Sequence, residues 1–274
     1  SRGLGDVYKR QDMIHVLRTI DPMLLERNRE GFLNGHTPFS AIVAFLSFYT
    51  AYLIGAEHIV LSNESSANEG NLSGASVNHQ YSKSFAFEHD FQQYAHKNLM
   101  PDIHYFSLLR PFNELQIAKY FAALPQYHAV FRSCNAGSKR NVWCRNCAKC
   151  LFVCGILSPF LPPEQLSAIF GENLLERDEL REIFDGLAGF SPLKPFECVG
   201  TQEELRFALA LAARQYRARG EALPALLQYF TQHADWEALS SDGSLLNAWN
   251  PQHEIPAAFQ PYIKEMHNYA AGIA

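Results

Sequence analysis

The sequence FRSCNAGSKRNVWCRNCAKCL, residues 131–151, decides the fold of this chain, because it places four of the six cysteines within seventeen residues. Two overlapping C-x-x-C pairs, and a further thiol that a Gly-containing loop brings back, can reach the corners of one tetrahedron, the geometry that zinc accepts from thiolates. No histidine lies inside the cluster, which favours a closed structural zinc site over a catalytic one. The alternatives are a redox C-x-x-C pair or buried thiols without a metal. The predicted ligands are Cys134, Cys144, Cys147 and Cys150.

Length and composition indicate a globular protein with one good-sized core, or one core and a small appended domain, since the 274 residues are 47% hydrophobic. The formal net charge of -5 argues against a nucleic-acid partner, because such binding needs a basic surface. Cysteines clustered at metal spacing predict a reducing compartment, the cytoplasm. Residues 37–56 carry no charge and could span a bilayer, but their serine, threonine and tyrosine residues favour a buried helix. We therefore expect no membrane partner.

The first eleven residues, SRGLGDVYKRQ, look like a translated sequencing-library adapter and are set apart from the fold. On this interpretation the natural sequence begins near Asp12, in the middle of a longer chain.

Strand and helix patterns alternate from residue 12 to about residue 124. Short strands are predicted at residues 12–20, in the run IVLSN and at residues 103–108, with helical patterns between them. The alternation predicts a partial doubly wound parallel sheet in an α/β domain, residues 12–160, which the cysteine cluster closes. Beyond it, helical stripes without strand signals predict a mainly helical region, residues 161–274. Two capping pairs mark helix starts, Asn113 with Gln116 and Thr201 with Glu204.

Polar residues follow the predicted strands, where ligands of doubly wound sheets bind. The loop SNESSANEGN, residues 62–71, is one such stretch, with a solvated surface loop as the alternative. Arg110 follows the next strand; it can grip an anionic group, or form a structural salt bridge to Glu114. His36 lies in the turn-rich loop GHTP, where a histidine commonly serves as a hydrogen-bonded spacer. In SPLKPFECVG, Lys194, Glu197 and Cys198 are either surface residues or carriers of proton transfer.

Eight separated motifs then occur in order, and together they resemble the family of UDP-N-acetylmuramoyl-L-alanyl-L-glutamate epimerases from about residue 12 to residue 210. The cysteine spacing also resembles the wider PP-loop ATP pyrophosphatase superfamily, which includes 7-cyano-7-deazaguanine synthase. That superfamily binds ATP through an SGGxDS-type loop, which this chain lacks, so we expect an N-terminally truncated chain that is inactive by itself. The motifs are NGHTPFSAI, SNESSANEGN, VNHQYSKS, YFSLLRPFNELQIA, FRSCN, WCRNCAKCLFV, IFGENLL and KPFECVG.

The resemblance implies that ATP activates the α-carboxylate of a terminal L-glutamate as an acyl-adenylate, which lets the α-proton leave and return on the opposite face. The implied cofactors are ATP, Mg and Zn, and the implied partner is a small-molecule nucleotide-sugar peptide. Another PP-loop ligase or amidase acting on a different carboxylate, and a non-catalytic zinc-stabilised module, are the alternatives. The resemblance implies proton transfer by residues among His79, Lys83, Glu64, Glu69 and Cys198, substrate binding by Arg110, Asn78 and Lys194, and cofactor binding by His36 and Asn63.

Overall fold

A computed structural model describes residues 13–33, 39–68, 81–192, 195, 197, 199–241 and 243–272. Its elements are mostly helical, with one small sheet. The helices are α1 (Pro22–Arg29), α2 (Phe39–Ile54), α3 (Phe85–Asn98), α4 (Glu114–Ala122), α5 (Ala148–Leu157), α6 (Pro163–Phe170), α7 (Arg181–Ala188), α8 (Gln202–Arg219), α9 (Ala225–His233), α10 (Trp236–Ser241), α11 (Ser244–Asn247) and α12 (Gln260–Ala271). The strands are β1 (His58–Leu61) and β2 (His104–Ser107), and short 3₁₀ turns include η1 (Ser65–Asn68) and η2 (Tyr81–Lys83).

The sheet consists of two parallel strands, with His58 opposite His104 and Leu61 opposite Ser107. Between the strands the chain forms α3, whose residues Phe91 and Ala95 are buried against β2, as their four-residue spacing predicts. Ser84 caps the N-terminus of α3 by accepting a hydrogen bond from the backbone of Phe87. This unit therefore brings the carboxyl ends of both strands to one edge.

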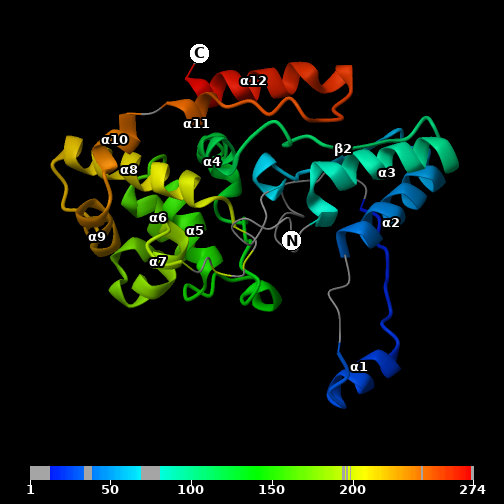
Figure 1. Ribbon diagram of the computed structural model, residues 1–274, viewed down its shortest axis with the longest axis horizontal. Helices are drawn as coiled ribbons and strands as arrows, with labels where there is room; N and C mark the ends of the chain where they lie inside the picture. The colour runs from blue at the N-terminus through cyan, green and yellow to red at the C-terminus, as the bar shows by residue number, and fades with distance from the viewer. Residues whose placement is uncertain are drawn as a thin grey trace.

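The prediction of a doubly wound sheet is not met among the described residues, which contain only this two-stranded sheet. Residues 13–20 form no strand, so the predicted strand at residues 12–20 is wrong for its described part. They form no strand ladder with β1, and their apolar side chains, including Met13 and Leu17, are exposed. An extended segment without a ladder partner is not a strand, whatever its pattern of side chains. In Figure 1, α1 projects away from the rest of the chain.

Helix α2, where the sequence predicts a buried helix, is buried on one face only. Ala44, Phe48 and Ala51 pack into a core with Ile59, Phe91 and residues next to them. The opposite face exposes large apolar side chains, among them Phe45, Tyr49, Tyr52 and Leu53. No helix in the described ranges has both the length and the apolar content that crossing a membrane requires.

The larger core lies in the helical half, and α5 is at its centre. Eight of its ten residues are buried. Gly155 lets α8 approach closely, since a Cβ at this position would lie 2.7 Å from Leu205 Cδ1. Figure 1 shows α5–α9 gathered on one side, α2 and α3 with the strands on the other, and α12 across the top. Ile263 and Met266 of α12 share a third core cluster with Phe106 of β2 and Phe112.

The predicted helices of this half are present. The sequence predicts helical stripes at residues 164–170, 176–187, 202–216 and 223–233. Helices α6 and α8 span the first and third, whereas α7 begins only at Arg181 and α9 at Ala225. Both capping boxes form, with Asn113 and Gln116 at α4 and Thr201 and Glu204 at α8. The division of the chain at residue 160 stays a prediction.

Candidate functional site

A buried arginine holds together the segments that follow the two strands. Arg110, which is 0% exposed, donates from Nη1 to the carbonyl of Glu64 at 2.9 Å and from Nη2 to the carbonyl of Lys83 at 2.8 Å. Nη2 also pairs with Glu88 Oε2 at 2.8 Å, and that carboxylate is 1% exposed. Glu88 accepts a further bond from the backbone of Ser107 at the end of β2. The loop after β1, the turn η2, helix α3 and strand β2 thus meet at one guanidinium.

The alternative considered for Arg110, a structural salt bridge to Glu114, is wrong in its partner, because Arg110 pairs with Glu88. The first turn of α3 places Glu88 directly beside the end of β2, a position that sequence distance did not reveal. Glu64 and Lys83, from two different predicted loops, come together as expected. Both terminal nitrogens of Arg110 are engaged by protein groups, so Arg110 positions these loops. Direct contact of Arg110 with a substrate anion stays a prediction.

Asn63 lies at the same edge of the sheet, where its Nδ2 donates to Ser107 Oγ at 3.2 Å. The side chain of Lys83 faces Glu64 closely enough for its charge to favour the ionised form of that carboxyl. His36, Glu69, Asn78, His79, Lys194 and Cys198 are predicted site residues that lie outside the described residues.

Three glutamates form a second feature of the site. Glu204, which is 2% exposed, accepts from Ser66 Oγ at 2.7 Å and from the backbone N–H of Glu114 at 2.8 Å through Oε1. Its Oε2 accepts from the backbone N–H of Thr201 at 2.5 Å. One carboxylate therefore joins the loop after β1 to the N-termini of α4 and α8. We call Glu64, Glu114 and Glu204 the carboxylate cluster.

Burial raises the pKa of two members of this cluster, Glu64 and Glu114. Removal from water raises the pKa of Glu64; its own backbone hydrogen bond and the charges of Arg110 and Lys83 oppose the shift, whereas Glu204 adds to it. Burial, followed by repulsion from Glu64 and Glu204, raises the pKa of Glu114 to about 8, and only Lys149 opposes the shift. A carboxyl group that holds its proton near neutral pH can act as a general acid.

A glycine brings the KPFECVG loop against the carboxylate cluster. A Cβ at Gly200 would lie 2.6 Å from Glu204 Oε2 and 3.0 Å from Glu114 Cγ, so a larger residue does not fit there without displacing them. Within this loop, Oε2 of Glu197 accepts a hydrogen bond from Nδ2 of Asn135 at 3.3 Å. The loop therefore runs from the cysteine region to the carboxylate cluster.

The four predicted cysteines converge on one point and could hold a metal ion. All four sulfurs lie within 4.8 Å of one another. The Sγ–Sγ distances are 3.8 Å for Cys134 and Cys147, 3.7 Å for Cys144 and Cys150, and 3.5 Å for Cys147 and Cys150. A tetrahedral ion with bonds of about 2.3 Å requires sulfur separations of roughly 3.8 Å. The donor set and its spacing fit such an ion, and Cys134 points toward the other three as predicted.

The metal centre adjoins the carboxylate cluster. Lys149 stands between the ligand positions 147 and 150, and its charge acts on Glu114. Cys134 Sγ accepts a bond from the backbone N–H of Gly137 at 3.2 Å, a contact that orients the thiolate. Cys154 is buried in the core of α5, as its apolar surroundings predict.

Sequence reasoning missed Glu88, Glu114, Glu204 and Lys149 as parts of the site. A signal existed for Glu204, because it is the third residue of a capping box, but that pattern predicts a helix start and not burial. Glu114 was considered only as a partner of Arg110. None of these residues is identified by its neighbours in sequence, because the groups that enclose it come from distant segments.

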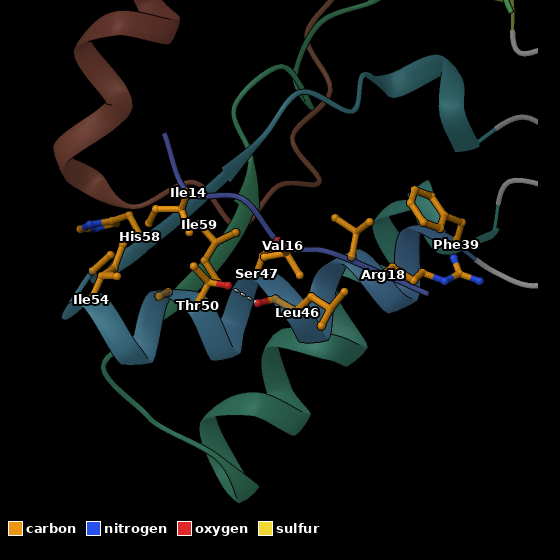
Figure 2. A pocket seen from close by; sticks show the side chains of 13 residues that line it. Ile14, Val16, Arg18, Phe39, Leu46, Ser47, Thr50, Ile54, His58 and Ile59 are labelled. Carbon is orange, nitrogen blue, oxygen red and sulfur yellow. Dashed lines mark hydrogen bonds between the residues drawn. The ribbon is translucent and has the colours of Figure 1, made fainter. Parts of the chain in front are cut away.

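A cavity of about 430 Å³ along α2 is separate from this site (Figure 2). It is lined mainly by apolar side chains, such as Ile14, Val16, Phe39 and Ile54. The extended residues 13–18 run beside α2 in this view. None of the predicted site residues lines it.

The parallel strand ends, the buried arginine and the carboxylate cluster define a mostly helical α/β protein, with four cysteines beside them that could hold a metal ion. More particularly, the chain belongs to the MurL family. The MurL N-terminal domain matches residues 6–108, and the MurL C-terminal domain matches residues 130–241. The first match includes residues 6–11, and their origin in an adapter stays a prediction.

Three curated relatives share the name UDP-N-acetyl-alpha-D-muramoyl-L-alanyl-L-glutamate epimerase. The protein from Xanthomonas oryzae pv. oryzae (strain MAFF 311018) is 40% identical over 219 residues, 77% of this chain and 49% of its own length. The protein from Micromonospora sp. (strain ATCC 39149 / NRRL 15099 / SCC 1413) is 36% identical over 255 residues, 91% of this chain and 56% of its own. The Salinispora tropica protein is 41% identical over 204 residues, which are 72% of this chain and 45% of its own length. The chain spans about half the length of these relatives. No solved structure matches it.

Proposed function

We propose that this chain supplies the proton-transfer site of an ATP-dependent epimerase that inverts the terminal L-glutamate of UDP-N-acetylmuramoyl-L-alanyl-L-glutamate during peptidoglycan precursor synthesis. The names of the relatives support the substrate and the reaction. The observation that carries the proposal is the carboxylate cluster, in which Glu64 and Glu114 are partly buried and have raised pKa values. We place the protein in the cytoplasm, where thiols such as its four clustered cysteines stay reduced.

The chemistry explains why such groups are needed. A free α-carboxylate disfavours removal of the neighbouring proton, because the product would carry two adjacent negative charges. Activation by ATP with Mg as an acyl-adenylate withdraws charge and lets the carbanion delocalise as an enolate. Inversion then needs a proton acceptor on one face of the α-carbon and a donor on the other.

The two glutamates differ in a way that fits these two roles. Arg110 and Lys83 both favour the ionised form of Glu64, which suits a proton acceptor. Only Lys149 favours ionisation of Glu114, and its pKa of about 8 keeps it protonated at neutral pH, which suits a donor. Lys83, His79, Glu69 and Cys198 remain candidates for the same roles. Arg110 and Glu204 hold the loops that carry these groups.

We propose zinc as the metal, in a structural role. Four thiolates at tetrahedral spacing leave no open coordination position, which is typical of structural zinc. The centre fixes the start of α5 and with it Lys149. Its contribution to the reaction is therefore positional.

Isotope exchange during turnover tests the proposal. The gene product that carries this sequence is incubated in D₂O with ATP, Mg and the L-glutamyl precursor, and chiral analysis and mass spectrometry follow the product. We expect ATP-dependent inversion with one deuterium at the α-carbon. Glu64→Gln should reduce the rate by roughly 100-fold or more, as loss of a general base does. Glu203→Gln, an exposed first-turn glutamate of α8, is the matched control. Inversion at the full rate in Glu64→Gln would overturn the assigned role.

A further inference from the structure

A polar cavity of about 510 Å³ lies beside the cysteine cluster, outside the carboxylate cluster. Its lining includes the cations Arg132 and Lys139, the hydroxyls of Ser133 and Ser138, and the amides of Asn135 and Asn141. These groups donate hydrogen bonds, the lining includes no carboxylate, and its remaining residue is Cys134 of the cysteine cluster. A second cavity, of about 530 Å³, shares Arg132 and adds Arg140 and Arg145. The size and the donors suit a phosphorylated small molecule.

The positive charge here is concentrated in sequence as well as in space. Residues 115–163 contain six lysines and arginines and no aspartate or glutamate, although the whole chain has a net charge of -5. Among the described residues, no salt bridge engages Arg132, Lys139 or Arg140. Arg145 has only a half-exposed pair with Glu172 at 3.5 Å. No carboxylate among the described residues therefore neutralises Arg132, Lys139 or Arg140, although Nη1 of Arg132 donates to the carbonyl of Phe131 and the hydroxyl of Ser138 to the carbonyl of Asn135.

Two buried donors at the cavity have no partner within the described ranges. They are Nε of Arg132 and Oγ of Ser133. A buried polar group without a hydrogen bond costs free energy, so such groups mark places where a ligand or water completes the bonding. Neither donor forms a hydrogen bond to a sulfur of the four described cysteines of the cluster. The negative charge of those thiolates therefore does not explain why the two donors are there.

The cavity borders the proposed active site through one loop. Asn135, in its wall, binds Glu197, and Gly200, three residues further on, contacts Glu204 and Glu114. A ligand held at Arg132 and Lys139 would lie next to the loop that reaches the carboxylate cluster. The carboxylate of Glu197 lies at the rim, where it is already bound by the amide of Asn135.

We propose that this cavity binds the diphosphate group of a nucleotide, with Arg132 and Lys139 as its cationic contacts. Guanidinium groups bind phosphate oxygens through paired hydrogen bonds, and lysine adds a point charge. The proposal rests on the proposed function for the source of the diphosphate, which is either the UDP group of the substrate or the phosphates of ATP. No covalent step is involved.

Calorimetric binding to the metal-loaded protein tests it, with UDP, ATP, pyrophosphate and uridine as probes. We expect UDP and pyrophosphate to bind, uridine to bind at least tenfold more weakly than UDP, and affinity to fall with added salt. Arg132→Gln and Lys139→Gln should each weaken UDP binding at least tenfold without changing metal content. Lys264→Gln, on α12, is the matched control. Tighter binding of ATP than UDP, with the same response to the variants, would assign the diphosphate to ATP.

Unchanged UDP and pyrophosphate affinity in both variants, or no binding of either probe by folded, metal-loaded protein, would overturn the proposal. Binding is measured without turnover. A negative result here therefore leaves the epimerase proposal intact, and loss of inversion in the isotope experiment leaves the binding result intact.

Discussion

Replacement of Glu114 by glutamine should stabilise the protein at neutral pH. Burial and the neighbouring Glu64 and Glu204 raise the pKa of Glu114 from its ordinary value of 4.5 to about 8. Between these two values the unfolded chain releases the proton and the folded chain retains it. The free energy of unfolding therefore decreases as pH rises through this range. Below the pKa of the unfolded chain there is no decrease, because both states are protonated. Glutamine keeps the shape of the protonated carboxyl but does not ionise.

The size of the effect follows from the two pKa values. Each pH unit above the unfolded value costs about 1.4 kcal/mol until the folded group ionises. The stabilisation by Glu114→Gln should thus rise from near zero at pH 4.5 to at most about 3 kcal/mol at pH 7, and level off above pH 8. Urea unfolding at half-unit pH steps, followed by circular dichroism, measures it.

Glu203→Gln provides the control, because Glu203 is an exposed glutamate in the first turn of a neighbouring helix. Its removal should change the free energy of unfolding by less than about 0.5 kcal/mol at every pH. The reasoning is refuted if Glu114→Gln is less stable than the unchanged protein at pH 7, or if the difference between them does not depend on pH.

Three further predictions concern other parts of the structure. Glu88→Gln should destabilise the protein by about 3 kcal/mol in urea unfolding, because it leaves the buried guanidinium of Arg110 uncompensated; a change below about 1 kcal/mol would contradict the role given to this pair. Cys134→Ser should lower bound zinc from one equivalent to well below one by atomic emission, since it removes one of four ligands; a full equivalent in this variant would exclude the four-thiolate site. Leu53→Glu, on the exposed face of α2, should reduce self-association in light scattering without lowering the thermal midpoint, whereas Ala44→Glu, which is 0% exposed, should unfold the chain.

Local spacing was enough to predict the features that depend on near neighbours. Both capping boxes could be read from residues three positions apart, because the side chain of the first residue bonds the backbone of the last. The three C-x-x-C cysteines were predicted for the same reason, and a short loop limits how far Cys134 can be from them. The meeting of Glu64 with Arg110 also followed, because parallel strands place their carboxyl ends at one edge.

Only the tertiary structure decided the partners of charged groups and the limits of burial. Arg110 pairs with Glu88 across 22 positions, and Glu204 binds Ser66 across 138. The apolar patterns at residues 12–20 and in α2 predicted a strand and a buried helix, yet the first has no ladder partner and the second is covered on one face. A pattern of side chains states which face can be buried. Whether another segment covers it depends on contacts between residues far apart in the chain, and such contacts also raise the pKa values of Glu64 and Glu114.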